Sequence, residues 1–187
     1  MTPVRVLGIS GSLRKGSYNS ALLRTAIELA PADVTIERAD LSEVPLYNGD
    51  VEAQGFPAPV QRLRDQVSAA DALLIATPEY NYSIPGVLKN AIDWVSRPVK
   101  GKQPFDGKPV ALMGTGGRFG SARSQYHLRQ VFVFLNLLPI NKPEVQIANA
   151  WEAFDAEGRL KDEKARKLVT ELVANLAAWT RQLGSGA

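Results

Sequence analysis

Val4-Arg-Val-Leu-Gly-Ile-Ser-Gly-Ser-Leu-Arg-Lys-Gly-Ser-Tyr-Asn19 joins a short apolar run, a loop and the start of a helical pattern. Within it, Gly8–Asn19 holds three glycines, three serines, an arginine, a lysine and an asparagine. Glycines let the backbone turn tightly and bring its N–H groups close to a ligand. Hydroxyl and guanidinium groups add donors, and the N-terminus of the following helix adds a partial positive charge. The combination predicts a phosphate-binding loop between a strand and a helix.

The order of strand, loop and helix repeats along the rest of the chain. The run 72–76 contains only apolar residues, as expected for a strand whose two faces are both covered by helices. Apolar residues at helical spacing separate the runs. We expect strands at 4–9, 34–40, 72–76, 110–113 and 144–147, and helices at 19–30, 60–71, 86–95, 121–136 and 161–183. This alternation predicts an α/β fold in a single domain (1–187), a three-layer α/β/α sandwich around a five-stranded parallel sheet.

Composition limits the chemistry that the side chains themselves can supply. The chain has 187 residues, 45% of them hydrophobic, and its net charge of +3 comes from dispersed basic residues. Dispersed charge argues against a nucleic-acid surface, and no apolar run approaches a membrane span, so we expect a cytoplasmic protein with neither partner. Cysteine is absent and His127 is the one histidine, which disfavours disulfides, zinc sites and a Ser-His-Asp triad. The demanding chemistry is therefore expected to reside on a bound cofactor.

Three loops are expected to lie together at one edge of the sheet. In open parallel sheets, ligands bind beyond the carboxyl ends of the strands. The loops after the first, third and fourth strands are rich in glycine, proline, aromatic and hydroxyl residues; they are Ser10–Ser17, Thr77–Pro85 and Gly114–Gly120. We expect them to converge on one site. The long connection 41–59 is a further segment of possible functional interest, because connections of this length are uncommon in compact domains.

The first loop matches neither of two common nucleotide-binding motifs. Against G-x-x-x-x-G-K-[ST], the glycine spacing fits, but Ser17 stands where lysine is needed and Tyr18 where Ser or Thr is needed. Against G-x-G-x-x-G, the glycine pair is missing, although Asp40 could serve as the ribose-binding acid. The remaining side-chain donors suit a phosphate monoester bound without a metal; they are Ser10, Ser12, Arg14, Ser17 and Asn19. The alternative is a turn that only caps a helix.

The second and third loops carry features that suit a flat ring. Tyr80 and Tyr82 offer aromatic surfaces, and backbone groups around Glu79–Asn81 could bond the edge of a ring. The glycines of Gly114–Gly120 could let the backbone pass close to such a ring. The alternatives are that the tyrosines are packing residues and that the glycine-rich loop is a flexible turn.

Two motifs identify a family that this sequence resembles. The segments Gly11–Asn19 and Thr77-Pro-Glu-Tyr-Asn-Tyr-Ser-Ile-Pro-Gly-Val-Leu-Lys-Asn-Ala-Ile-Asp-Trp94 resemble the two signature motifs of the NAD(P)H-dependent FMN reductases. The segments 121–130 and 141–144 are similar to the bacterial quinone/chromate reductase branch of that family. The resemblance covers the chain from Val4 to Val145, and the last forty residues match only in being helical.

The resemblance implies a flavodoxin-like fold with strand order 2-1-3-4-5 and non-covalently bound FMN, with NADPH or NADH as co-substrate. It implies that the first loop holds the FMN phosphate, the second lies along the isoalloxazine and the third covers its other edge. It implies neither a catalytic side chain nor a metal ligand. The implied cofactor-binding residues are Ser12, Arg14, Ser17, Tyr18, Asn19, Pro78, Glu79, Tyr80, Asn81, Tyr82, Thr115, Gly116 and Gly117.

The implied activity is ping-pong transfer of hydride from NAD(P)H through FMN to quinones, chromate, azo compounds or free flavin. Arg118 and Arg123 are candidates for recognising the 2′-phosphate of NADPH. The resemblance also implies a homodimer or homotetramer, with 121–136 and 41–59 as candidate contact regions. The alternative function is a flavodoxin-type electron carrier with no small-molecule substrate, although flavodoxins are usually acidic and this chain is not. A flavin-free regulatory or scaffolding relative is a third hypothesis.

Overall fold

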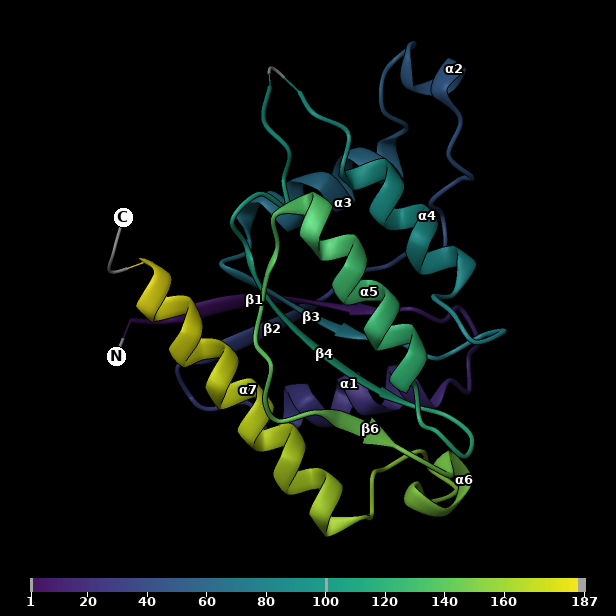
Figure 1. The fold of residues 1–187 in the computed structure, drawn as a ribbon, viewed down its shortest axis with the longest axis vertical. Helices are drawn as coiled ribbons and strands as arrows, with labels where there is room; N and C mark the ends of the chain where they lie inside the picture. The colour runs from purple at the N-terminus through teal and green to yellow at the C-terminus, as the bar shows by residue number, and fades with distance from the viewer. Residues whose placement is uncertain (1, 100, 185–187) are drawn as a thin grey trace.

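A parallel sheet runs through the centre of the computed structural model, which describes residues 2–99 and 101–184. The strand order is β2-β1-β3-β4-β5, with β6 also paired to β4, so the predicted flavodoxin-like order is confirmed (Figure 1). Every strand pair is parallel. The strands are β1 (Val4–Ser10), β2 (Val34–Arg38), β3 (Ala72–Ala76), β4 (Pro109–Thr115), β5 (Leu138–Pro139) and β6 (Val145–Ile147).

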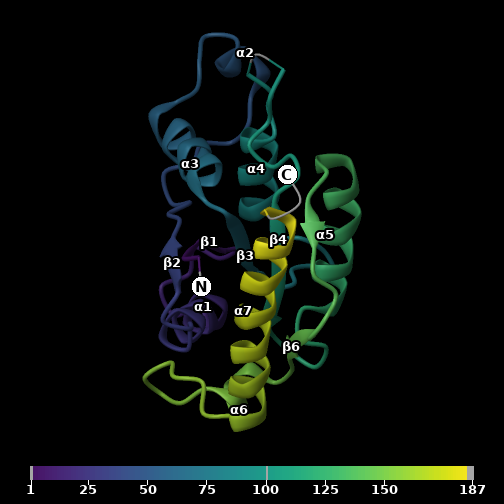
Figure 2. The same ribbon diagram turned by 90° about the vertical axis from the view of Figure 1, so that its left-hand side faces the viewer.

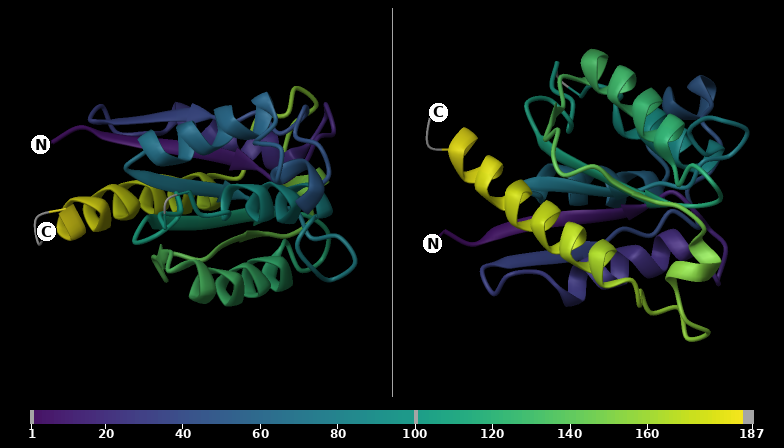
Figure 3. Two further views of the ribbon diagram at one scale, coloured as in Figure 1. Left: turned by 90° about the horizontal axis from the view of Figure 1, so that it is seen from above. Right: turned by 60° about the horizontal axis from the view of Figure 1, so that its bottom comes forward.

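Helices cover both faces of this sheet and complete the predicted three-layer sandwich (Figures 2 and 3). One face packs against α1 (Tyr18–Glu28) and α7 (Glu163–Gly184). The other face packs against α3 (Ala58–Ala69), α4 (Gly86–Val95) and α5 (Ala122–Leu135). Two single-turn helices that the sequence patterns did not predict, α2 (Gly49–Glu52) and α6 (Ala150–Ala153), lie in connections.

The two cores follow from the alternation of side chains along each strand. In β3, Ala72 and Leu74 belong to the core under α1 and α7, whereas Leu73 and Ile75 belong to the core under α3, α4 and α5. All five residues of this strand are buried. A strand buried on both faces needs an uninterrupted apolar sequence, which explains why the run 72–76 has no polar residue.

At the edge of the sheet beside β4, the sequence predicts a single strand at 144–147. The structure shows that this prediction was incomplete. Two short segments fill it: β5 pairs with the start of β4, and β6 pairs with its end. Pro139 and Pro143 occur within this stretch, and proline has no N–H to continue a ladder. The edge of the sheet is therefore divided between two short strands.

The connection 41–59 is anchored on α4 by one buried tryptophan. The indole Nε1 of Trp94 donates to the carbonyl oxygen of Pro45 at 2.8 Å, and its ring lies edge-on to Tyr47 with centroids 4.9 Å apart. The backbone N–H of Tyr47 also donates to Oδ1 of Asn90 at 2.7 Å. These contacts hold the long segment above α3 and α4, at the top of Figure 1.

Candidate functional site

The three loops Ser10–Ser17, Thr77–Pro85 and Gly114–Gly120 meet beyond the carboxyl ends of β1, β3 and β4. The backbone N–H of Gly11 bonds the carbonyl of Ala76, and the hydroxyls of Ser12 and Tyr80 lie 3.4 Å apart. Parallel neighbours in the sheet end at the same edge, so consecutive loops are brought side by side. The structure thus brings the three loops together.

Asn19 ties the first loop to the third. Its amide Nδ2 donates to the carbonyl oxygen of Thr115 at 2.9 Å, and its Oδ1 accepts the N–H of Thr115 at 3.0 Å. The two residues are only 3% and 1% exposed. The amide of Asn19, expected at the phosphate, is thus occupied by the backbone of β4, and its position fixes where the two loops stand.

Ser17 and Tyr18 also take part in the fold. The hydroxyl of Ser17 accepts the N–H of Ser20 at 3.2 Å and forms the N-cap of α1. The ring of Tyr18 lies 5.3 Å from that of Phe154, against the core beneath α7. The hydroxyl of half-buried Ser12 accepts the backbone N–H of Arg14 at 3.3 Å, whereas the guanidinium of Arg14 makes no hydrogen bond or ion pair within the described residues. Arg14 is thus a first-loop side chain that remains available to an anion, as is its neighbour Lys15.

The second loop ends in a tight two-residue hairpin. The backbones of Tyr80 and Ser83 exchange hydrogen bonds of 3.1 and 3.0 Å. Asn81 and Tyr82 between them have φ values of 50° and 65°, which type I′ hairpins require and which non-glycine residues seldom adopt. The turn leaves Tyr80 and Tyr82 exposed by 50% and 66%, so these tyrosines are not core packing residues.

Glu79 joins the second loop to the N-terminus of α5. Its carboxylate accepts the backbone N–H of Arg123 at 2.9 Å and the side-chain Nε of Arg123 at 2.6 Å. A carboxylate at a helix N-terminus is stabilised by the helix dipole. The Arg123 guanidinium in turn lies over the rings of Tyr82, at 3.7 Å, and Phe119, at 4.7 Å. The Glu79 carboxylate therefore positions the loop, and a ligand would meet its backbone.

Phe119 is a site residue that the sequence patterns did not identify, and Arg123, named from the sequence only as a candidate for the 2′-phosphate, is instead engaged by Glu79 and Tyr82. Phe119 lies within the third loop and Arg123 in the first turn of α5, on the edge where Glu79 was already expected. That proximity of opposite charges along one edge was the available signal. The stack of Tyr82, Arg123 and Phe119 could be seen only in three dimensions.

The third loop contains one glycine that close packing requires, Gly114, and another that lies next to open space, Gly117. A Cβ at Gly114 would lie 1.9 Å from Oγ of Ser121 and 2.3 Å from the carbonyl oxygen of Thr77. A Cβ at Gly117 would meet no described heavy atom within 4 Å. Thr115 directs its hydroxyl to the carbonyl of Ile147 at 2.9 Å and is therefore turned away from the loop surface.

Two cavities of about 280 Å³ lie at this edge of the sheet. One is formed by the second and third loops, with Glu79, Asn81, Tyr82, Gly117–Gly120 and Arg123 around it. The other lies beside the first loop, between the ends of β1 and β2. Because both cavities adjoin the convergent loops, the carboxyl edge offers room for a ligand longer than a single ring.

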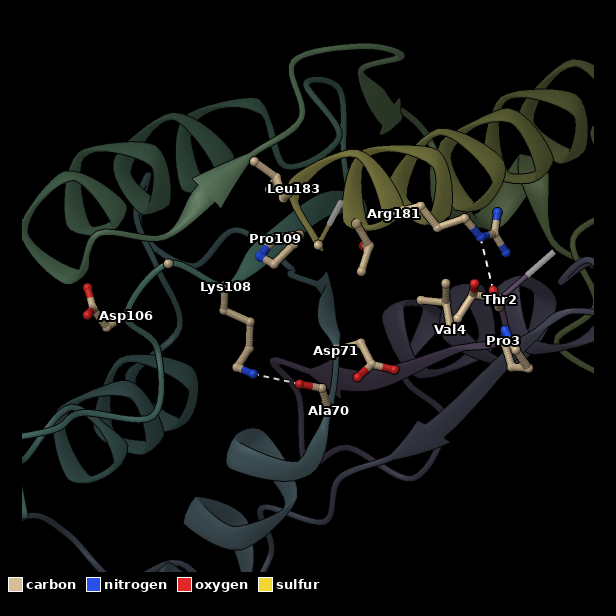
Figure 4. A pocket seen from close by; sticks show the side chains of 13 residues that line it. Thr2, Pro3, Val4, Ala70, Asp71, Asp106, Lys108, Pro109, Arg181 and Leu183 are labelled. Carbon is tan, nitrogen blue, oxygen red and sulfur yellow. Dashed lines mark hydrogen bonds between the residues drawn. The ribbon is translucent and has the colours of Figure 1, made fainter. Parts of the chain in front are cut away.

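A larger cavity, of about 650 Å³, lies at the opposite edge, before the strands begin (Figure 4). Its charged side chains already bond the protein: Lys108 Nζ donates to the Ala70 carbonyl, and Arg181 bonds the Thr2 carbonyl and Asp33. Burial lowers the pKa of Lys108. This cavity contains none of the residues expected at the site, so size alone does not mark the functional edge.

Comparison with known proteins decides the family. The profile of the NADPH-dependent FMN reductase family matches residues 4–152. The chain belongs to this family. It is 62% identical to an NAD(P)H-dependent FMN reductase of Pseudomonas aeruginosa over 96% of this chain and 97% of that protein, and 46% identical to an NADPH:quinone oxidoreductase of Arabidopsis thaliana over 96% and 93%.

A solved structure of a related enzyme supports the same family assignment. The flavoenzyme NAD(P)H:(acceptor) oxidoreductase FerB from Paracoccus denitrificans superposes with a TM-score of 0.86 at 36% identity, over 96% of this chain and 98% of that one. The chain is thus an oxidoreductase of a family that uses FMN and NAD(P)H. Within residues 2–99 and 101–184, every helix is too short or too polar to cross a bilayer, and no acidic, His or Cys cluster suits a metal ion.

Proposed function

We propose that the reductase is one FMN-binding domain that uses NAD(P)H to reduce quinones. The observation that supports this most directly is the convergence of a donor-rich loop at a helix N-terminus with two loops that frame an open cavity. Bound FMN supplies the hydride chemistry, so the side chains need only bind and orient. The acceptors expected beyond quinones are chromate, azo compounds and free flavin.

The residues of the first loop fit a phosphate monoester. Arg14 supplies a cation without a protein partner among the described residues, and Ser12 supplies a hydroxyl. The first N–H groups of α1 add donors and a partial positive charge. Ser17, Tyr18 and Asn19 hold the loop in shape through the cap, the ring contact and the bond to β4.

The residues of the second and third loops fit a flat, polar-edged ring. Exposed Tyr82 and Asn81, at the tip of the hairpin, border the cavity, and exposed Tyr80 lies next to the hydroxyl of Ser12. Glu79 sets the position of that hairpin through its bond to Arg123, Thr115 sets the third loop through its bond to Ile147, and the carbonyl of Pro78 accepts the hydroxyl of Thr77. Gly117, whose Cβ would meet no described heavy atom within 4 Å, leaves backbone accessible on the other side, whereas the N–H and carbonyl of Gly116 already bond Ile147 and Ala150. Backbone N–H groups near the ring would stabilise negative charge that develops on it.

The function is tested by mixing the FMN-loaded protein with NADPH without oxygen. Rapid loss of the flavin absorbance, and its return on adding a quinone, are expected because one site serves both half-reactions. A panel of quinone, chromate, azo dye and free flavin then ranks the acceptors. A flavin that stays oxidised with both NADPH and NADH would instead favour the electron carrier, and a colourless protein that does not take up FMN would favour the flavin-free relative.

Arg14→Ala is expected to weaken FMN binding by about 1.5–3 kcal/mol, because it removes a charge-assisted hydrogen bond. This corresponds to a dissociation constant about ten- to hundredfold higher. Fluorescence titration of the apoprotein with FMN measures the effect. Arg5→Ala, which removes the same charge at the opposite edge of the sheet, is the control and should leave FMN affinity unchanged. Equal affinities in wild type and Arg14→Ala would refute the phosphate assignment.

We also propose that the reductase self-associates as a homodimer or homotetramer. Val133 and Phe134 on α5 are 82% and 83% exposed, and Leu46 in the 41–59 connection is 84% exposed. Apolar groups this exposed indicate a surface that another chain covers. Sedimentation at micromolar concentration should give a dimer or larger species, and Phe134→Asp should shift it toward the monomer. A wild-type monomer would contradict the proposal.

A further inference from the structure

The cavity beside the first loop shares Ser12 and Arg14 with the proposed site of the FMN phosphate, and it extends from there to parts of the chain that the flavin site does not explain. It has a volume of about 280 Å³. The first loop, the first turns of α1 and the segment 38–42 after β2 surround it. Ser17 and Asn19, at the very start of α1, do not line it. It therefore lies on the side of the loop that faces β2, away from β3 and β4.

The charge around this cavity is strongly positive. Arg14, Lys15 and Arg38 line it, and within the described part of the chain none of their side chains forms a hydrogen bond or a salt bridge. Arg24 also lines it, although its Nη2 reaches toward Gly158. The one carboxylate is that of Asp40, whose pKa is lowered chiefly by the N–H of Ser42, at 2.9 Å. One carboxylate among several cations leaves a net attraction for an anion.

Two buried hydroxyls provide a further hydrogen-bond donor beside these cations. Ser10 and Ser20 line the cavity, each is 7% exposed, and their Oγ atoms lie 2.8 Å apart. One proton forms that hydrogen bond. The other hydroxyl proton has no acceptor among the described residues, and a buried donor left without an acceptor is unfavourable. An anion oxygen in the cavity would accept it.

The place of the cavity in the fold matches a position that discriminates between nicotinamide nucleotides in other doubly wound proteins. There, an acid after the second strand bonds the ribose 2′-hydroxyl, or a nearby arginine accommodates the 2′-phosphate. This chain has Arg38 as the last residue of β2 and Asp40 two residues later. The loops after β3 and β4 lie about 10–14 Å away, two to three strand spacings along the sheet. An extended dinucleotide can span that length.

We propose that this cavity binds the 2′-phosphate of NADPH through Arg38 and Lys15, and that the reductase therefore prefers NADPH to NADH. The inference rests on the proposed function, because NADPH is the co-substrate of the reaction proposed at this edge of the sheet. It also replaces the two arginines that the sequence offered as candidates for the 2′-phosphate. Arg123 is engaged by Glu79 and by two aromatic rings, and Arg118 lies by the other cavity, over Phe119.

The test compares Lys15→Gln, Arg38→Gln and the double variant with Arg118→Gln, which removes the same charge at the rival position. The ratio of kcat/KM for NADPH to that for NADH should fall about ten- to hundredfold in the double variant, since charge-assisted bonds to the phosphate are lost. The ratio should not change in Arg118→Gln. FMN content, measured by absorbance, should be equal in all four proteins.

Three outcomes would overturn the inference. The first is an unchanged ratio in the double variant, and the second is a fall in the ratio in Arg118→Gln instead. The third is a loss of FMN from Arg38→Gln, which would assign the cavity to the FMN phosphate. Calorimetric binding of 2′,5′-ADP against 5′-ADP needs no turnover: wild type should prefer 2′,5′-ADP and the double variant should lose that preference. This measurement still decides the inference if no nucleotide is oxidised, a result that would refute only the proposed function.

Discussion

Gly114→Ala is expected to lower the free energy of unfolding by at least about 3 kcal/mol, at the upper end of the usual cost of overpacking. The added Cβ would lie 2.3 Å from the carbonyl oxygen of Thr77 and 1.9 Å from Oγ of Ser121. A side chain can rotate away, but the carbonyl of Thr77 belongs to backbone whose N–H is already bonded to Met113. Relief therefore requires β3 and β4 to separate at the edge that carries the site.

Thermal and urea unfolding of the apoprotein measure this effect. For a chain of this size, about 3 kcal/mol corresponds to a fall in Tm of about 6–12 °C. Gly117→Ala is the matched control, three residues along the same loop, because its Cβ would meet no described atom within 4 Å. We expect the control to unfold within about 0.5 kcal/mol of wild type. Equal stability of the two variants would show that the strands accommodate the methyl group.

Asn19→Ala is the second change with a large expected effect, a loss of about 2–5 kcal/mol of stability. It removes both hydrogen bonds between the amide and the backbone of Thr115. The N–H and carbonyl of Thr115 would then be buried without partners, and each unpaired group costs about 1–3 kcal/mol. The first loop would also lose its attachment to β4, so FMN retention should fall as well.

Measuring the apoprotein separates the two possible roles of Asn19. If the amide holds the fold, chemical denaturation without FMN already shows the loss of stability. If the amide acts only on the phosphate, the stability of the apoprotein stays at the wild-type value and FMN affinity alone falls. Asn175→Ala removes an exposed asparagine that makes one 3.4 Å bond to the carbonyl of Lys142, and it should change stability little.

Local patterns along the chain were sufficient for the architecture and for the edge of the sheet that carries the site. An apolar strand such as 72–76 has no stable arrangement except between two layers of helices. Because parallel strands end at one edge, the three loops had to meet there. The two signature motifs then indicated the family, and the family profile matches residues 4–152.

Patterns of propensity were less informative where a short element depends on its neighbours. The last position of the sheet is shared by β5 and β6, and α2 and α6 are single turns within connections. Such elements contain too few residues to show a period, and contacts to the rest of the protein stabilise them. The position of the 41–59 connection likewise depends on the contact between Trp94 and Tyr47, which are far apart in the sequence.

The sequence by itself determined which residue types stand at the functional edge: a donor-rich first loop, tyrosines in the second and glycines in the third. Only the tertiary structure decided which of those groups remain free for a ligand. Asn19 and Glu79 have the chemistry of ligand-binding residues, yet the backbone of Thr115 and the start of α5 occupy them. Arg14, Lys15 and Arg38 have no such partners among the described residues. The physical reason is that polar groups buried by folding must find partners, and those partners come from segments distant in the sequence.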